Sequence, residues 1–230
     1  MDDTRDDAAR TRYQPVLRPW TGSDADAQAV LRAFEAPGMA GQSRSAIASL
    51  DDARAWTAAL VPDPSDKVPR SVAFAIDLKG TAVGHVMVSA MERRHLTGWV
   101  SYWVASSARG RGLAAAGAAG LAEYCFAQLG LYRLELGHRV NNPASGRVAA
   151  AAGFTQEGIE RQKLRYQDDG GTWQRFDTAL WARLATDPVP VVVPLEVLPG
   201  GGTVASGGAG LSGPRKPFRG PGRCARRSNG

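Results

Sequence analysis

Apolar and polar residues alternate with changing periods along the central part of this chain. Stretches in which apolar residues recur every three or four positions predict helices, and continuous or alternating apolar stretches predict strands. Two helices are expected first, then a run of neighbouring strands, and only the second half alternates strand and helix. The expected strands cover residues 15–20, 71–78, 81–91, 98–104, 132–140, 154–159 and 176–184, and the expected helices begin near residues 23, 49, 113 and 144.

This order of elements predicts an α+β or mixed α/β fold, because a regular ladder would alternate strands and helices throughout. The domain is expected to span residues 15–187, after a flexible N-terminus at residues 1–14. From residue 188 the chain is rich in Pro and Gly without a repeat. That composition is typical of disorder, so residues 188–230 are predicted to form a disordered basic tail.

Charge and composition exclude several function classes. The net charge is +6, but residues 214–230 hold six Lys and Arg and no acid, so the rest has 22 basic and 22 acidic residues. A neutral domain of this kind predicts no specific nucleic-acid binding. No apolar run approaches the roughly 18 residues of a membrane helix, and the charged start resembles no secretory signal, so the expected location is the cytoplasm. Two cysteines and three scattered histidines predict no metal site.

The stretch "VASSARGRGLAAAG" at residues 104–117 carries the clearest chemical signal. A strand ends, the chain turns, and a helix begins, so backbone N–H groups and the positive end of the helix dipole face one place. Such a turn binds a phosphate or pyrophosphate. Gly112 allows the anion to approach the backbone. The predicted pyrophosphate contacts are Arg109, Gly110, Arg111, Gly112, Leu113 and Ala114.

The same letters also fit a dinucleotide-binding fingerprint. Gly110, Gly112 and Ala115 have the spacing G-x-G-x-x-A, and Glu135 stands about where a ribose-binding acid belongs. That fingerprint normally occupies the first strand-to-helix turn of its domain, whereas here it follows several strands. A dinucleotide-binding oxidoreductase is therefore the weaker alternative.

Four segments together resemble the GNAT superfamily of acetyl-CoA-dependent N-acetyltransferases, and within it the branch of Rim-type ribosomal-protein N-terminal acetyltransferases. The resemblance runs from about residue 16 to residue 184. The segments are "LRPW", "SYWVASSARGRGLA", "LGLYRLEL" and "NNPASGRVAAAAGFTQEG".

The resemblance implies a splayed mixed sheet flanked by helices, with acetyl-CoA as co-substrate. The sheet opens between its fourth and fifth strands, and unpaired backbone groups there bind the pantetheine arm of the cofactor. The expected contacts are the backbone of Trp103 and Val104 and the side chain of Asn142. By its residue type, Asn142 is equally suited to cap the following helix.

Transfer of acetyl to an amine needs a polarised thioester carbonyl, an uncharged amine and a proton for the leaving thiolate. A backbone N–H near Val104 is the expected oxyanion donor. By resemblance, Ser145 is the expected proton donor, although it can also bond helix backbone only. Where relatives place a catalytic glutamate this chain has Leu164, so Glu157, Glu160 and Glu92 remain as candidate bases. Cys125 lies in an apolar helix and is expected to be a core residue.

The predicted function is therefore acetyl transfer by direct attack in a ternary complex. The acceptor is a primary amine, either a protein N-terminus or a small molecule, and the protein is expected to be a monomer or homodimer. An acetyl-CoA-binding module without catalysis, acting as a sensor or partner protein, would carry the same phosphate turn and remains an alternative.

Overall fold

The computed structural model describes residues 14–43, 45–62, 69–167 and 171–199. In this part of the chain, seven strands form one mixed sheet in the order β1-β2-β3-β4-β5-β7-β6. The predicted mixed α/β fold is confirmed. The strands are β1 (Val16–Pro19), β2 (Val72–Leu78), β3 (Thr81–Glu92), β4 (Thr97–Val104), β5 (Arg133–Arg139), β6 (Thr155–Gln167) and β7 (Trp173–Leu184); the helices are α2 (Asp24–Phe34), α3 (Leu50–Ala58), α4 (Leu113–Ala127) and α5 (Pro143–Ala151), with short 3-10 turns η1 (Ala40–Gln42) and η2 (Ser106–Ala108).

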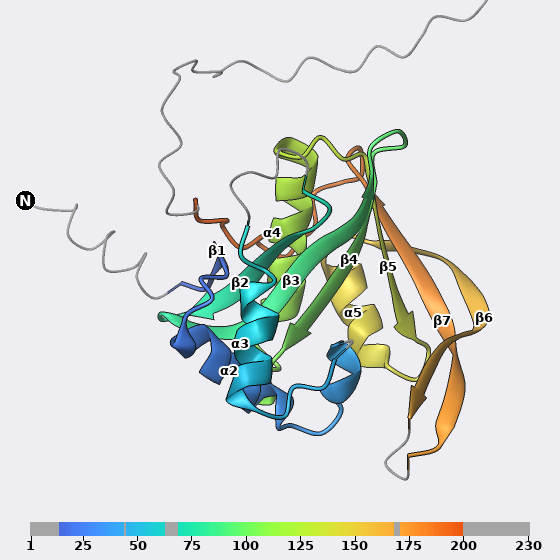
Figure 1. Ribbon diagram of the computed structural model, residues 1–230. Helices are drawn as coiled ribbons and strands as arrows, with labels where there is room; N and C mark the ends of the chain where they lie inside the picture. Colours follow the sequence, from blue (N-terminus) through green and yellow to red (C-terminus); the bar gives the residue numbers. More distant parts are fainter. Residues whose placement is uncertain (1–13, 44, 63–68, 168–170, 200–230) are drawn as a thin grey trace, which may run out of the picture. The chain divides into compact units, whose positions relative to one another are not determined.

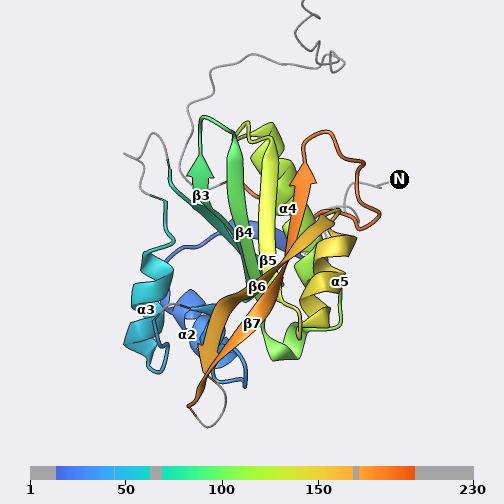
Figure 2. The same cartoon turned by 90° about the vertical axis from the view of Figure 1, so that its right-hand side faces the viewer.

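Helices cover both faces of the sheet. Helices α2 and α3 lie on one face, and α4 and α5 lie on the other (Figures 1 and 2). Helix α4 approaches the sheet closely because it is built largely from Ala and Gly. A Cβ added at Gly117 would lie 3.0 Å from the Cδ1 of Ile76 and 3.2 Å from the Cγ1 of Val86. Small residues on this helix therefore allow it to pack closely against β2 and β3.

The sheet opens between β4 and β5. These parallel strands pair only over Thr97–Trp99, opposite residues 133–135. Both strands continue beyond the last pair, to Val104 and Arg139, and they move apart toward those ends (Figure 1). The result is a slot bordered by unpaired strand edges, as the family resemblance implied.

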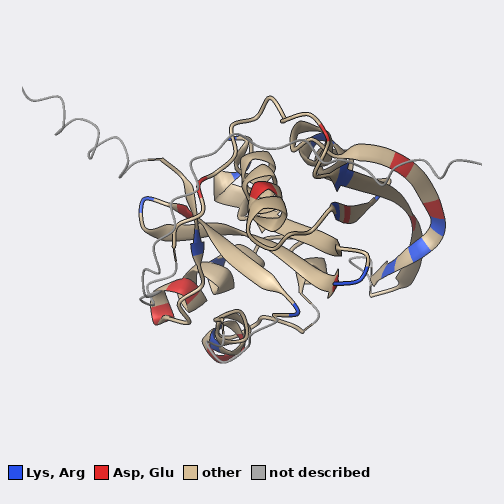
Figure 3. Ribbon diagram, turned by 90° about the horizontal axis from the view of Figure 1, so that it is seen from above, with Lys and Arg blue, Asp and Glu red and all other residues tan. Residues whose placement is uncertain are grey.

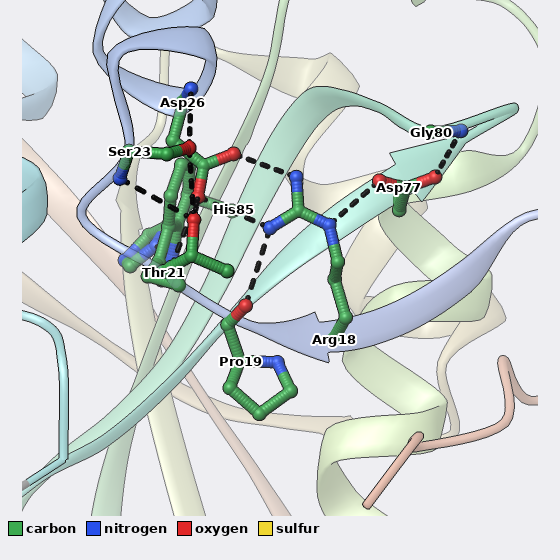
Figure 4. A network of polar contacts seen from close by, with 9 residues as sticks. Arg18, Pro19, Thr21, Ser23, Asp26, Asp77, Gly80 and His85 are labelled. Carbon is green, nitrogen blue, oxygen red and sulfur yellow. Dashed lines mark hydrogen bonds and ion pairs between the residues drawn. The ribbon is translucent and has the colours of Figure 1, made fainter. Parts of the chain in front are cut away.

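A single ion-pair network fixes α2 to the edge of the sheet (Figure 4). Arg18 on β1 binds Asp26 of α2 (Nη2–Oδ1 2.6 Å) and Asp77 of β2 (Nε–Oδ2 2.7 Å). Asp26 is buried, and it also accepts a hydrogen bond from the backbone N–H of Thr21 (3.0 Å). Because both carboxylates are partnered, their burial is compatible with a stable fold.

Strands β6 and β7 are longer than the sequence pattern indicated. The expected strands ended at residue 159 and began at residue 176, but the hairpin extends through residues 155–167 and 173–184. Two register irregularities interrupt its pairing, between residues 156 and 158 and between residues 160 and 164. Acidic and basic residues both occur along it, as the red and blue segments of the ribbon show (Figure 3). Bulges and polar side chains remove the strict alternation by which a strand is recognised.

The packed chain continues beyond the boundary expected at residue 187. Leu195 is buried, and its N–H donates to the carbonyl of Ala116 in α4 (3.0 Å). The N–H of Leu17 donates to Glu196 (2.8 Å), and the N–H of Leu198 donates to Leu17 (2.7 Å). Residues 195–198 thus lie along β1 as an added edge and are part of the domain. Residues 1–13 and 200–230 of the predicted flexible ends lie outside the described residues.

None of the described helices is long and apolar enough to cross a lipid bilayer.

Candidate active site

The turn before α4 has the geometry of an anion site. Gly112 is the N-cap of α4 with φ 74° and ψ −1°, and no side chain caps the helix. The first backbone N–H groups of the helix therefore have no intrahelical or side-chain partner. A Cβ added at Gly112 would meet no atom within 4 Å, so the space in front of the turn is open. Gly110 also has a positive φ, and Arg111 between the two glycines is exposed.

Arg109 fixes this turn to the end of β4. Its Nε donates to the carbonyl of Val104 (3.1 Å), and its Nη2 lies 3.4 Å from the Sδ of Met39. The guanidinium thus links the turn to the end of β4. Both Arg109 and Arg111 are exposed, so both charges can be reached by an incoming anion.

The strand geometry identifies which backbone groups face the slot. The N–H of Ala105 donates to Val83 of β3 (2.9 Å). Hydrogen-bonded and non-bonded pairs alternate along antiparallel strands, so Trp103 also faces β3, whereas Tyr102 and Val104 face the slot. The backbone of Val104 therefore faces the slot and that of Trp103 faces β3. A cofactor contact at Val104 stays a prediction, and Tyr102 replaces Trp103 as the second candidate. Sequence reasoning missed this because the alternation depends on the register with β3.

Asn142 and Ser145 begin helix α5 at the open end of the slot. Asn142 caps the helix, and its Oδ1 accepts from the N–H of Ser145 (3.3 Å). The hydroxyl of Tyr102, on β4, lies 2.8 Å from Ser145 Oγ and donates to the Ser145 carbonyl (3.0 Å). Burial raises the pKa of Tyr102 to about 12, so this hydroxyl stays protonated. Tyr102 is a site residue that the sequence analysis did not identify.

Glu92, one of the three candidate bases, lies far from the open end of the slot. Glu92 stands opposite Thr97, roughly 20 Å along β4 from Val104 at about 3.3 Å per residue. Its carboxylate accepts from the backbone N–H groups of Arg94 and His95, and these bonds hold its pKa below the usual value. Glu92 thus stabilises an exposed hairpin turn and is not a base in the proposed mechanism.

Glu157 is engaged in an ion pair. Its Oε1 accepts from the Nη1 of Arg133 (2.9 Å), whose guanidinium also binds Glu135 (2.7 Å). The hydrogen bond to Arg133 lowers the pKa of Glu157, which makes it a weaker base. Arg133 lies opposite Thr97 at the paired end of the slot. Glu160 lies opposite Thr178, which in turn lies opposite Arg139 at the open end of β5. Of the three candidates Glu160 is thus the one at that end, and its carboxylate is engaged in an ion pair with Lys163.

Two further predictions concern Cys125 and Glu135, and the structure shows where each residue lies. Cys125 is fully buried in α4, and burial raises the pKa of its thiol to about 12, as a core residue requires. Glu135, the acid of the dinucleotide alternative, lies within β5 and pairs with Arg133. The turn at Gly112 follows a strand of an antiparallel meander, so the context of a dinucleotide fold is missing.

A cavity of about 1050 Å³ lies beside the C-terminal half of α4 and residues 194–199. Among its described lining residues there is none of the predicted site residues. The predicted site residues therefore do not point to this cavity as the active site.

Comparisons with known proteins agree with this geometry. The family model described as "Acetyltransferase (GNAT) domain" matches residues 15–155. The curated proteins gave no match. Among solved structures, RimJ of Mycobacterium smegmatis in complex with CoA-disulfide is 27% identical over 75% of this chain and 86% of its own, with a TM-score of 0.62.

Two further structures share the fold at lower identity. Ribosomal-protein-S5-alanine acetyltransferase from Vibrio fischeri is 22% identical over 74% of this chain and 93% of its own (TM-score 0.62). A chimera of the spermidine N-acetyltransferase SpeG from Vibrio cholerae and hSSAT is 17% identical over 74% and 95% (TM-score 0.59). Since these neighbours are named for different acceptors, the fold alone does not select the amine.

The match over more than half of the chain, together with the open slot and the anion turn, confirms the family that the sequence resembles. The chain belongs to the GNAT family of acetyltransferases, and it is an N-acetyltransferase whose co-substrate is acetyl-CoA and whose acceptor is an amine.

Proposed function

We propose that this protein transfers the acetyl group of acetyl-CoA directly to a primary amine in a ternary complex, without an acetylated enzyme. The observation that carries the proposal is the position of Ser145. Its hydroxyl stands at the open end of the slot and is held there by Tyr102. A donor, an unpaired strand edge and an anion turn thus border one site.

Each part of the site has a role in holding the co-substrate. The N–H groups at the start of α4, with Arg111, bind the pyrophosphate. The backbone of Tyr102 and Val104 pairs with the amides of the pantetheine arm, and Asn142 combines its capping role with a contact to that arm. Acetyl-CoA supplies the thioester carbonyl and the thiolate leaving group. The N–H of Val104 faces the slot and is the proposed donor to the carbonyl oxygen as it gains charge.

Ser145 is the proposed proton donor to the leaving sulfur. The carbonyl of Ser145 can only accept, so the Tyr102 hydroxyl donates to it, and in the 2.8 Å contact the Ser145 hydroxyl donates to the Tyr102 oxygen. We propose that the Ser145 hydroxyl turns from this oxygen to the sulfur when acetyl-CoA is bound. Tyr102 thereby acts as a positioning residue that keeps Ser145 Oγ at the slot. In the transfer, the bond from nitrogen to the acetyl carbon forms and the carbon–sulfur bond breaks. Ser145 gives its proton to sulfur, and the proton that the nitrogen loses on becoming an amide returns to Ser145 through water.

The amine must arrive without its proton. With Glu92 and Glu157 engaged elsewhere and Glu160 paired with Lys163, we propose that water takes this proton before attack. An α-amine has a pKa of about 7.7–8.0, whereas a lysine side chain has a pKa of about 10.4. At neutral pH a useful fraction of an α-amine is already uncharged, so a site without a strong base favours α-amines over lysine side chains.

The test is a panel of primary amines incubated with acetyl-CoA and scored by release of free thiol. Thiol release that requires an amine supports transfer, and intersecting initial-velocity lines support a ternary complex. Binding of acetyl-CoA with no thiol release from any amine supports a sensor or partner module instead. Parallel lines would indicate an acetylated enzyme and contradict direct attack.

We further propose that the acceptor is a protein N-terminus or a small-molecule amine, that the protein is located in the cytoplasm, and that it is a monomer or homodimer.

A further inference from the structure

Arg139 is the last residue of β5 and stands at the open end of the slot. The last paired residues of the two parallel strands are Trp99 and Glu135. Counting on from this pair along both strands brings Arg139 level with Trp103 of β4. The next residue of β4 is Val104, whose N–H is the proposed donor to the thioester carbonyl. Arg139 therefore borders the slot at the level of the proposed acetyl transfer.

The side chain of Arg139 lies on the face of the sheet away from α4 and α5. Side chains alternate between the two faces of a strand, and Leu134 and Leu136 of β5 are buried in the core that α4 shares. Arg139 therefore points to the opposite face. Because α4 and α5 cover the first face and the pyrophosphate is proposed to lie at the start of α4, the side of Arg139 is the one from which an acceptor reaches the thioester (Figure 2).

Two aromatic rings of the β6–β7 hairpin hold the Arg139 guanidinium. Its central carbon lies 4.4 Å from the centroid of the Tyr166 ring and 5.2 Å from that of the Phe176 ring. The Tyr166 ring also approaches η1, because a Cβ added at Gly41 would lie 2.8 Å from its Cε1. The hairpin and the loop that contains η1 thus meet at the ring on which Arg139 is stacked.

The N–H donors of Arg139 are available to a ligand. Within the described residues the guanidinium has neither a hydrogen bond nor an ion pair, and the two rings are its partners. The residue is half-buried, and none of its nitrogens is among the fully buried polar atoms without a partner, so solvent reaches them. Stacking uses the faces of the planar guanidinium and leaves the N–H groups at its edge, in a fork that fits the two oxygens of a carboxylate.

The charges around Arg139 favour an anionic ligand group. Glu160 lies across β7 from Arg139, and its carboxylate is paired with Lys163. The carboxylate of Asp177 on β7 accepts from the backbone N–H of Gln162 (2.8 Å). Both of these hairpin carboxylates are thus engaged, whereas no described carboxylate neutralises the charge of Arg139. A cationic group on the acceptor would be repelled there, and a carboxylate would be attracted.

We infer that Arg139 binds a carboxylate of the acceptor, so that the site prefers amines that carry a carboxylate over neutral amines and polycations. This inference rests on the proposed function, because it assigns a substrate class to the acceptor side of the same site. The carboxylate can come from an acidic side chain that follows a protein N-terminus or from a free amino acid. Arg139 determines specificity and takes no part in the proposed proton transfers.

The first test measures binding of acetylated products and so does not depend on catalysis. Two pairs differ by a carboxylate against an amide: N-acetyl-L-phenylalanine and its amide, and two N-acetylated dipeptide amides in which phenylalanine is followed by aspartate or by asparagine. Each compound is titrated calorimetrically into protein saturated with CoA. We expect the carboxylate of at least one pair to bind about fivefold or more tightly than its amide, because bonds between ions are the stronger ones. The pair that shows the difference identifies the source of the carboxylate.

Two variants assign this difference to Arg139. Arg139→Gln removes the charge and should abolish it. Arg165→Gln is the matched control, because the Arg165 guanidinium is also stacked 4.4 Å from a ring, that of Trp173 on the same hairpin, but Arg165 is adjacent to Tyr166 and points to the opposite face. The control should keep the natural difference. Absence of a carboxylate preference in the natural-sequence protein, or the same preference in Arg139→Gln, would overturn the inference.

Steady-state kinetics test the same residue in the transfer reaction. The acceptors are dipeptide amides in which phenylalanine is followed by aspartate or by lysine. We expect kcat/KM to favour the aspartate peptide by about tenfold or more in the natural-sequence protein, through KM, and to favour the lysine peptide in Arg139→Glu. A merely structural defect would lower both values without reversing their order, so an unchanged order would contradict the inference. If no amine is acetylated, the proposed function fails and the titration still decides the inference.

Discussion

The hydroxyl of Tyr102 lies 2.8 Å from the Oγ of Ser145, and so joins β4 to the first turn of α5 across the open end of the slot. The contact brings together two residues that are 43 positions apart in the sequence. It also sets a serine hydroxyl, which by its type is often bonded to its own helix, toward the slot.

Substitutions at Ser145 and Tyr102 distinguish a catalytic role of Ser145 from a role at the start of α5. Ser145→Ala should lower kcat about 100-fold, the low end for general acid catalysis, and leave acetyl-CoA affinity unchanged. Tyr102→Phe should lower kcat less, by about tenfold, because it removes only the contact that positions Ser145. Steady-state kinetics and calorimetric Kd values measure both. A Ser145→Ala protein that keeps its kcat and loses only about 1 kcal/mol of stability would assign Ser145 to the helix start alone.

Asn142→Ala should act in a different way. Its Oδ1 caps α5 and is proposed to contact the pantetheine arm, so the variant should lose about 1 kcal/mol of stability and weaken acetyl-CoA binding before it affects kcat. Melting curves and the acetyl-CoA Kd give the two effects separately. Lower stability with an unchanged Kd would leave Asn142 with the capping role only.

Glycine at position 112 should be required for binding of the co-substrate. Gly112→Val places a side chain in front of the uncapped N–H groups and forces a valine into a left-handed conformation, so CoA binding should be lost. Gly80→Val is the control, because Gly80 has φ 80° and open space around it, like Gly112, but lies in the β2–β3 turn. Calorimetry should find CoA binding in the control and none in Gly112→Val. Equal affinity in both would contradict the placement of the pyrophosphate.

The stability of the domain should fall on mild acidification because of His85. Burial lowers its pKa to about 3, well below the value of about 6.5 in an unfolded chain. Below pH 6.5 only the unfolded state takes up the proton, so stability is lost as the pH falls toward 3. Between pH 7 and pH 5 the expected loss is about 2 kcal/mol, or several degrees in Tm. This window lies above the range in which unfolded carboxyl groups titrate.

Melting curves of His85→Gln test this prediction. Glutamine does not titrate, so the Tm of this variant should change less between pH 7 and pH 5 than that of the parent protein. His95→Gln replaces an exposed histidine and should retain the parental slope. Identical slopes in all three proteins would show that His85 is not responsible.

Truncation should distinguish the two parts of the C-terminal region. Deletion of residues 200–230 should leave Tm and turnover nearly unchanged. Deletion from residue 188 also removes the buried Leu195 and the backbone bonds to Leu17, and should lower Tm by several degrees, since burial of one leucine contributes about 1.5–3 kcal/mol. Equal melting temperatures for the two truncated proteins would show that residues 188–199 do not stabilise the domain.

Much of the fold could be read from local patterns. Helices α2 and α3 begin near the expected residues 23 and 49, where Ser23 and Ser49 cap them, and the apolar strands β2 to β4 lie where the pattern placed them. The outer halves of β6 and β7 could not be recognised, because bulges and charged residues hide the alternation. Residues 195–198 were assigned to the tail from composition, yet they pair with β1 through contacts that no local pattern encodes.

The site was predictable only in part, because some of its residues are brought together by tertiary contacts that no local pattern encodes. Gly112 and Ser145 stand in local motifs and were identified from them. Tyr102 was missed because its place in the site depends on a contact between β4 and α5. Whether a candidate glutamate is free to act as a base also depends on its tertiary partners. Glu157, for example, is engaged by Arg133.

The most direct test of the central claim is a single reaction in which free thiol and N-acetylated product are measured together. The natural-sequence protein, acetyl-CoA and L-phenylalaninamide are mixed, with Gly112→Val and Gly80→Val run in parallel. The account predicts equal amounts of thiol and acetylated amide from the natural-sequence and Gly80→Val proteins, and neither product above background from Gly112→Val. Thiol release without acetylated amine, or full activity of Gly112→Val, would contradict acetyl transfer from a co-substrate bound at this turn.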